Sequence, residues 1–377
     1  MGSLKSFDPS ASPYGRKCTI VIPTHNRPHY LARTLGYLSK FGRGAPIIIA
    51  DSGDTKTQIA NKETISSFSS LDIVYRTHAV SSEPFGGFES KIIDALNLSD
   101  TKYCVLSADD DLIAPVGISR CVDFLENNPD YAVAHGQYLY FWADSKFRNS
   151  LGWKPVYDGR SLTHPDPAYR LVYHLSRYPT DTTYYAVHQT AFLKHMLQKV
   201  VESGLKSVVF RELYSTGITV IRGKTKHLNV FYCAKDRCSE RVQQVPDMRE
   251  LRATSAYSDE QNKFSEILAH YLSEHVGLLP RVSRTAVDTA FSGYSDRALH
   301  RNQTYLQRSV MSARGNLYSK KMGWAYEYPK RAYRRIFPKD AYSVMRGQYW
   351  IALRSRFWAN YDDFRNAGQF VVAGSRN

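Results

Sequence analysis

The chain has 377 residues, of which 43% are hydrophobic and 23% are charged, and it carries 50 Lys and Arg against 35 Asp and Glu. This composition is typical of a globular protein and excludes a disordered or fibrous chain. The first residues lack the apolar core of a signal peptide, and no run of about 18 apolar residues occurs. We therefore expect a cytoplasmic protein.

The positive charge is concentrated near the C-terminus. Residues 301–377 contain 15 basic and 4 acidic side chains, a net +11, which leaves +4 for residues 1–300. Residues 326–337 alternate aromatic with basic side chains, which suits peripheral contact with an anionic membrane surface, such as the inner face of a cell membrane. A basic helical subdomain that packs on the rest of the chain or forms a homo-oligomer explains them equally well. We expect no specific nucleic-acid partner.

Strand and helix patterns alternate from residue 17 onward. Residues 17–22 form a β-rich apolar run that ends at Pro23, and Asn26-Arg27-Pro28 then has the form of a helix start. Leucines recur at helical spacing up to about residue 41, and residues 46–50 form a second, fully apolar strand. A strand, a helix and a strand within about 35 residues indicate a parallel βαβ unit.

The pattern then repeats with strands at 72–75 and 103–106 and a helix at 88–97. The sequence therefore predicts an α/β fold with an open, mostly parallel sheet flanked by helices. Beyond about residue 240 helical patterns dominate, for example at 259–275 and 341–358, so we expect an α/β domain at 1–240 and a basic, mainly helical domain at 241–377. Ligands of such sheets bind beyond the carboxyl ends of the strands, which directs attention to residues 23–26, 51–54 and 107–111.

Three adjacent aspartates, Asp109, Asp110 and Asp111, follow the apolar strand 103–106. Carboxylates at close range repel one another unless a cation lies among them. Oxygen ligands of this kind suit Mg²⁺ or Mn²⁺, with phosphate oxygens completing the shell. The alternative is a solvated acidic turn that caps the next helix.

Asp51 follows the second strand in the stretch Asp51-Ser52-Gly53-Asp54. At this place a carboxylate can accept hydrogen bonds from a base or a ribose. The alternative is an ordinary Asp-Gly turn with a helix cap, and the two roles are compatible.

Three segments, 19–28, 50–54 and 108–111 followed by Pro115, resemble the family 2 glycosyltransferases of the GT-A fold in order and in spacing. The resemblance covers about residues 17–240 and implies a catalytic domain like that of spore-coat polysaccharide synthase. It implies that a nucleotide sugar is held by Pro23, Thr24, His25, Asn26, Arg27, Asp51, Asp109 and Asp110. It also implies that a metal ion, Mn²⁺ or Mg²⁺, bridges Asp109 and Asp111 to the donor diphosphate.

The chain departs from the family pattern at two places. Ala108 stands where the family often has an aspartate, which leaves open which carboxylates bind the metal. Glu89-Ser90-Lys91 replaces an Ala-Arg-Asn stretch, so Lys91 either supplies the positive charge at the nucleotide or is a surface lysine of a helix.

Inverting transfer needs a general base for the acceptor hydroxyl. Family members place an acidic residue at the start of a helix after the acceptor region, and the segment 210–214 resembles that place. Glu212 is therefore the candidate base, against a plain surface glutamate or a partner of Arg211. Asp181 is the second candidate.

We expect a metal-dependent inverting glycosyltransferase that moves a sugar from a nucleotide-diphosphate donor, with a UDP-sugar favoured, to a hydroxyl acceptor. The acceptor is a glycan, a lipid-linked or a small molecule, in glycan or polysaccharide biosynthesis. The alternatives are an inactive glycosyltransferase-like scaffold and a polyanion-binding protein.

Overall fold

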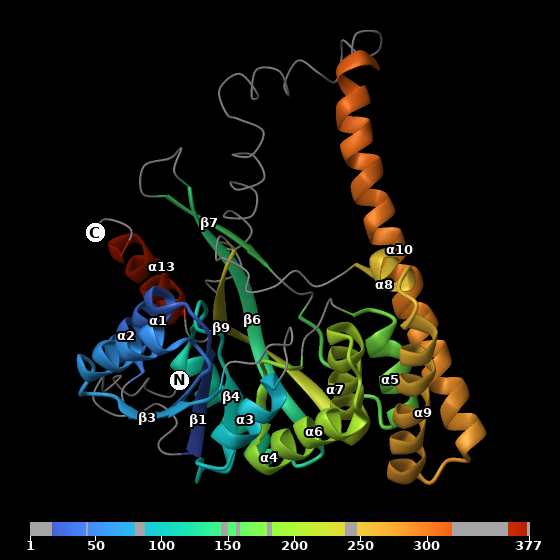
Figure 1. Cartoon of the computed structure of the whole chain (residues 1–377), viewed down its shortest axis with the longest axis horizontal. Helices are drawn as coiled ribbons and strands as arrows, with labels where there is room; N and C mark the ends of the chain where they lie inside the picture. Colours follow the sequence, from blue (N-terminus) through green and yellow to red (C-terminus); the bar gives the residue numbers. More distant parts are fainter. Residues whose placement is uncertain are drawn as a thin grey trace, which may run out of the picture.

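The computed structural model describes residues 17–42, 44–79, 87–144, 150–155, 159–178, 183–237, 247–318 and 361–374. The expected helix at 341–358 and the aromatic and basic run at 326–337 lie outside these residues. Figure 1 shows one mixed sheet with helices against both faces and a long helix that leaves the body at one end.

The secondary structure follows the predicted alternation closely. The strands are β1 (Cys18–Thr24), β2 (Pro46–Asp51), β3 (Asp72–Thr77), β4 (Tyr103–Leu106), β5 (Leu112–Ile113), β6 (Tyr131–Asp144), β7 (Ser150–Pro155), β8 (Val187–Gln189) and β9 (Lys224–Asp236). The helices are α1 (Pro28–Phe41), α2 (Thr55–Ser66), α3 (Phe88–Leu96), α4 (Pro115–Asn127), α5 (Pro167–Leu175), α6 (Thr190–Ser203), α7 (Val208–Arg222), α8 (Met248–Arg252), α9 (Tyr257–Val276), α10 (Pro280–Tyr318) and α13 (Tyr361–Gly374).

The sheet has the order β3-β2-β1-β4-β8-β6-β9-β5, and β7 pairs with β6. Its first four strands are all parallel, as predicted, and β9 runs parallel to β6. Antiparallel pairs join β4 to β8, β8 to β6, and β5 to β9. The carboxyl ends of β1, β2 and β4 therefore meet at one edge, and the predicted fold class is confirmed.

The alternation of side chains along the strands divides the core into two clusters, one on each face of the sheet. In β1, Val21 belongs to one cluster, whereas Ile20 and Ile22 belong to the other. Side chains of a strand alternate between faces, so an apolar strand of this kind needs a cover on both sides. Helices α1, α4 and α13 supply the cover of one face, and α3, α6 and α7 supply that of the other.

Helices from beyond residue 240 complete both clusters. Phe264 of α9 and Phe291 of α10 pack with Phe210 of α7, with ring centroids 5.5 and 5.6 Å from it. On the other face, Phe364 of α13 lies 5.6 Å from Phe231 of β9, and Phe370 lies 5.6 Å from Tyr37. The expected boundary near residue 240 stays a prediction, because the described C-terminal helices share their core with the α/β part.

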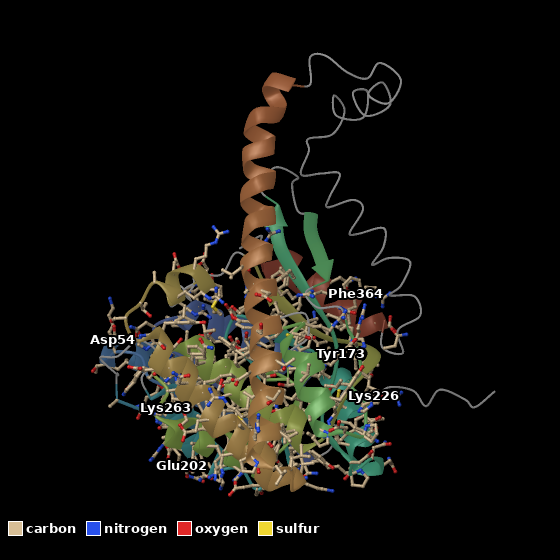
Figure 2. All side chains as sticks on the ribbon, turned by 90° about the vertical axis from the view of Figure 1, so that its right-hand side faces the viewer. Asp54, Tyr173, Glu202, Lys226, Lys263 and Phe364 are labelled. Atoms are coloured by element: carbon tan, nitrogen blue, oxygen red, sulfur yellow. The ribbon has the colours of Figure 1, made fainter. Side chains whose placement is uncertain are left out.

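Helix α10 runs along the body and then extends beyond it, as the turned view in Figure 2 also shows. Within the described ranges, no helix combines the length and the apolar composition that crossing a membrane would require.

Candidate active site

The chain leaves β1 through a loop that is tied to two neighbouring strand ends. Thr24 is the last residue of β1, and its hydroxyl donates to Asp109 Oδ2 at 2.8 Å. Asn26 has a left-handed φ of 53°, a conformation that Asn tolerates better than most residues. Its side-chain oxygen accepts the backbone N–H of Asp54 at 2.8 Å. The loop that we expect to hold the nucleotide is therefore fixed by β2 and β4.

Pro23 and His25 flank Thr24 in this loop. Pro23 is partly buried and lies opposite Ala50 in the parallel pair of β1 and β2. His25 Nδ1 lies 2.8 Å from the backbone oxygen of Ser52. Their roles in nucleotide binding stay predictions.

Asp51 ends β2 and is completely buried, with 0% of its surface exposed. Its Oδ1 accepts the backbone N–H of Gly53 at 2.7 Å, and its Oδ2 accepts the Asn61 amide at 2.8 Å and the Tyr75 hydroxyl at 2.6 Å. Protein donors therefore satisfy both oxygens, so the Asp-Gly turn exists as the sequence suggests. The contact of Asp51 with a nucleotide base stays a prediction.

Lys91 is a buried lysine of α3, with 7% of its surface exposed, and not a surface lysine. Its Nζ donates to the Thr24 backbone oxygen at 3.2 Å and to Ser52 Oγ at 2.9 Å. Burial lowers the pKa of Lys91 to about 8, against the opposing charges of Asp51 and Asp109. The structure therefore brings a cationic side chain to the loop after β1.

The aspartate cluster lies between β4 and β5, and all three side chains are buried. The Arg27 guanidinium pairs with both oxygens of Asp109, with its Nε 3.3 Å from Oδ2, and its Nη2 lies 3.0 Å from Asp110 Oδ2. The Thr34 hydroxyl donates to the backbone oxygen of Asp109 at 2.7 Å. Burial raises the pKa of Asp109, and the hydrogen bond and the charge of Arg27 lower it. The predicted donor residues Arg27, Asp109 and Asp110 are thus in direct contact with one another.

Asp111 forms an ion pair with a different cation, Lys235. Lys235 of β9 places its Nζ 2.5 Å from Asp111 Oδ2 and 4.4 Å from the centroid of the Tyr185 ring. Burial raises the pKa of Asp111 to about 6, against the charge of Lys235. The backbone oxygen of Tyr185 accepts the hydroxyls of Tyr138 and Tyr232, each at 2.9 Å, which fixes the aromatic residue beside the cluster.

Three carboxylates have the chemistry that a hard divalent ion prefers. Nevertheless, Asp109 is paired with Arg27, and Asp111 with Lys235, so each of the two predicted metal ligands already has a cationic partner. Within the part of the chain that the structure describes, no group of three acidic, histidine or cysteine side chains is arranged to hold a metal ion. In this conformation the cluster does not fit a ready-made metal site.

Glu212 lies near the start of α7, and its side chain is exposed. Loss of water around the carboxyl group nevertheless raises the pKa of Glu212, and a hydrogen bond with Tyr178 lowers it. The charges of Glu212 and Asp111 both act on the hydroxyl of Tyr185. The candidate base and the aspartate cluster are therefore both within electrostatic range of Tyr185. Asp181, the second candidate, lies outside the described residues.

Two charged pairs at this edge were not predicted from the sequence. Arg211 Nε lies 3.5 Å from Glu89 Oε1, and both side chains are largely buried. Lys235 pairs with Asp111, as described above. A lysine that follows the apolar run 230–234 at the carboxyl end of a strand was a usable signal, because a buried cation needs an anionic partner.

Comparisons with known proteins gave one family match and several similar solved structures. Residues 19–200 match the family described as Glycosyl transferase family 2. A structure of S. aureus TarS 1–349 is 15% identical, covers 83% of this chain and 77% of that chain, and has a TM-score of 0.48. The same fragment in complex with UDP-GlcNAc is 13% identical, covers 76% and 92%, and has a TM-score of 0.45.

The mannosyltransferase PcManGT from Pyrobaculum calidifontis, solved with GDP-Man and Mn²⁺, is 14% identical. That alignment covers 99% of this chain and 90% of the mannosyltransferase, with a TM-score of 0.41. A comparison with curated proteins gave no match. The family match covers the loop after β1, the turn after β2, Lys91 and the aspartate cluster. Residues 19–200 belong to glycosyl transferase family 2, and the chain is a glycosyltransferase.

Proposed function

We propose that this glycosyltransferase moves a sugar from a nucleotide-diphosphate donor to a hydroxyl acceptor, with inversion at the anomeric carbon. The observation that carries the proposal is the meeting of Thr24, Lys91 and the aspartate cluster at the carboxyl ends of β1, β2 and β4, with the charges of Glu212 and Asp111 both acting on Tyr185. A donor bound at this edge would present its anomeric carbon toward α7.

In the proposed reaction, the acceptor oxygen attacks the anomeric carbon while its proton passes to the Glu212 carboxylate. The bond between the anomeric carbon and the diphosphate oxygen breaks, and the nucleoside diphosphate leaves with the electron pair. A raised pKa suits Glu212 for this work, since a base with a higher pKa accepts the proton more readily.

Charge develops on the leaving diphosphate as the bond breaks. Three described cations lie beside the proposed donor position and can act on it: Lys91 at the loop after β1, and Arg27 and Lys235 at the aspartate cluster. Fixed cations in a partly dehydrated site stabilise such a charge more strongly than water does. We assign this stabilisation to Lys91, Arg27 and Lys235. We assign binding of the nucleotide to Pro23, Thr24, His25, Asn26 and Asp51.

The dependence on Mn²⁺ or Mg²⁺ stays a prediction, and no step of the reaction above depends on it. The cluster would offer a carboxylate to an ion that arrives with the donor, because such ions keep most of their shell from water and phosphate.

We propose a UDP-sugar as the first donor to test and a glycan, a lipid-linked or a small molecule as the acceptor. The basic segment beyond residue 300 would attract the enzyme to the anionic cytoplasmic face of a membrane, where a lipid-linked acceptor would be found.

A thermal-shift panel tests the donor site. UDP-, GDP-, dTDP- and CDP-sugars are added to the full chain, each with and without Mn²⁺, because a ligand of the native state raises the melting temperature. One nucleotide class should raise the melting temperature, and Lys91→Met should remove that rise. An absence of any shift with all four donors would contradict the proposal.

A further inference from the structure

We infer that Arg27 and Lys235 are built-in counter-cations of the aspartate cluster, so that the nucleotide-free protein holds no divalent ion there. The inference concerns the proposed donor site and rests on that assignment. Its test uses metal alone, so that its failure can be told apart from a failure of the proposed function.

The first step is the contact between Arg27 and the cluster. A divalent ion that bridged this cluster would need the outward oxygens of at least one aspartate. The Arg27 guanidinium occupies both oxygens of Asp109 and also reaches Asp110. Only 11% of the Arg27 side chain and 5% of the Asp109 side chain are exposed, so this pair is held inside the protein and is not a loose surface contact. An ion cannot take the position of the guanidinium while Arg27 stays there.

Lys235 does the same for the third aspartate. Its Nζ lies 2.5 Å from Asp111, and the pair is shielded, with 15% and 4% of the two side chains exposed. The ring of Tyr185 lies against the ammonium group at 4.4 Å, and an aromatic face stabilises a cation at that distance. Removal of Lys235 from this position therefore costs two contacts.

Other charged groups at the edge do not change this result. Arg33 donates to the backbone oxygen of Asp110 and pairs with Asp236 at 2.6 Å, so its charge is matched outside the cluster. Lys91 adds positive potential at Asp109. Three carboxylates thus face two bonded cations and a third nearby, which leaves little negative charge for a divalent ion.

The charge balance implies an order of events. A donor diphosphate brings its own negative charges, which can pair with Arg27 and free Asp109 and Asp110 for an ion. Metal binding in the cluster should therefore appear only with nucleotide, or when the counter-cations are removed by substitution.

Mn²⁺ binding to the nucleotide-free full chain, followed by electron paramagnetic resonance of the free ion, tests this order. The wild type should show no saturable site below millimolar Mn²⁺. Arg27→Gln should bind Mn²⁺ at least on the order of tenfold more tightly, since removal of a unit charge a few ångströms away has that effect even in a polar medium. Arg27→Lys, which keeps the charge, should stay close to wild type.

Two controls locate the effect. Arg76→Gln removes an exposed arginine that pairs with Asp94 at 2.9 Å instead of with an aspartate of the cluster, and it should leave Mn²⁺ binding unchanged. Asp110→Asn in the Arg27→Gln background should abolish the new site. If Arg27→Gln lowers stability, Mn²⁺ should raise its melting temperature by more than it raises that of the wild type.

Tight binding of one Mn²⁺ to the nucleotide-free wild type, lost on Asp110→Asn, would overturn the inference. So would Arg27→Gln with no gain in Mn²⁺ affinity and no added thermal stabilisation. Neither outcome bears on the proposed function, which fails only if nucleotide sugars do not bind in the donor panel.

Discussion

At the scale of single residues, burial separates the acidic side chains of this edge into groups with different tasks. Both carboxylate oxygens of Asp51 accept hydrogen bonds, from Gly53, Asn61 and Tyr75, and these bonds fix the turn after β2. Glu212 is an exposed residue, but loss of water around its carboxyl group raises the pKa of that group. A group that is reachable and reluctant to ionise is suited to accept a proton, whereas a saturated buried group is suited to hold structure.

Glu212→Gln should therefore lower turnover by about 10²–10⁴-fold, the range for loss of a general base. Donor affinity should stay near the wild-type value, because the amide keeps the shape of the side chain. Steady-state kinetics and calorimetric donor binding measure the two effects, and Glu202→Gln on the neighbouring helix α6 is the control for an exposed glutamate. The acidic limb of the wild-type pH profile should lie above that of an ordinary glutamate, since the pKa of Glu212 is raised. Normal turnover of Glu212→Gln would move the assignment to Asp181.

At the scale of elements, the site depends on helices that approach the sheet closely. Gly117 of α4 is one such contact: an added Cβ would lie 2.6 Å from the backbone oxygen of Phe231 in β9. Gly36 of α1 is a helical glycine with room, since its nearest neighbour would be a Phe370 side-chain carbon at 3.4 Å. Of these two glycines, Gly117 is the one at which packing requires the absence of a side chain.

Gly117→Ala should therefore destabilise the protein by about 1–3 kcal/mol, because backbone atoms of β9 would have to move. Gly36→Ala should be neutral or stabilising by up to about 1 kcal/mol, since alanine favours the helix. Urea unfolding of the two variants measures the difference. Equal stability would show that α4 does not press on β9 as described.

At the scale of the whole molecule, the core contains several neutral histidines. Burial lowers the pKa of His135, His174 and His188 to about 4 and that of His227 to about 3. An unfolded chain binds protons at histidine near pH 6.5. Below that pH the unfolded state binds more protons than the folded state, so acid favours unfolding.

The free energy of unfolding should accordingly be greatest above about pH 6.5 and fall toward about pH 4. For each histidine the loss is about 1.4 kcal/mol per pKa unit between its folded and unfolded pKa. His227→Asn should make the slope of unfolding free energy against pH shallower, whatever its effect at neutral pH. His270→Asn, which changes an exposed histidine 3.2 Å from Glu274, should leave the slope as it is. An identical slope in all three proteins would contradict the prediction.

The basic C-terminal charge makes a second prediction for the whole molecule. Replacement of Lys330, Arg331, Arg334 and Arg335 by Gln should weaken binding to anionic vesicles on the order of hundredfold or more at low salt, as each basic residue near such a surface contributes about 1 kcal/mol. Substitution is a better test than truncation, because α13 beyond this segment packs on the core of the sheet. The control replaces four exposed lysines of the body with Gln: Lys56, Lys62, Lys206 and Lys263. Equal losses in both proteins would refute a specific membrane contact.

The sequence by itself determined the strands of the parallel half, the order of the three polar segments and the family. The apolar residues at 18–22, 46–50 and 103–106 are buried on both faces, and such runs are patterns local to the sequence. Residues that follow such runs lie at the carboxyl ends of the strands, so Thr24, Asp51 and Asp109 could be placed at one edge of a parallel sheet without coordinates.

Only the tertiary structure decided what those residues touch. Arg27 meets Asp109 across 82 positions of the chain, and Lys235 meets Asp111 across 124. No local pattern records a contact between residues so far apart, because strand order and side-chain direction fix it together. The packing of the C-terminal helices could not be predicted for the same reason, because it also joins residues far apart in the chain. The sequence predicted helices beyond residue 240, one of them at 259–275. Which face of the sheet each helix would cover depended on the folded sheet, and α9, α10 and α13 complete cores that begin more than a hundred residues earlier.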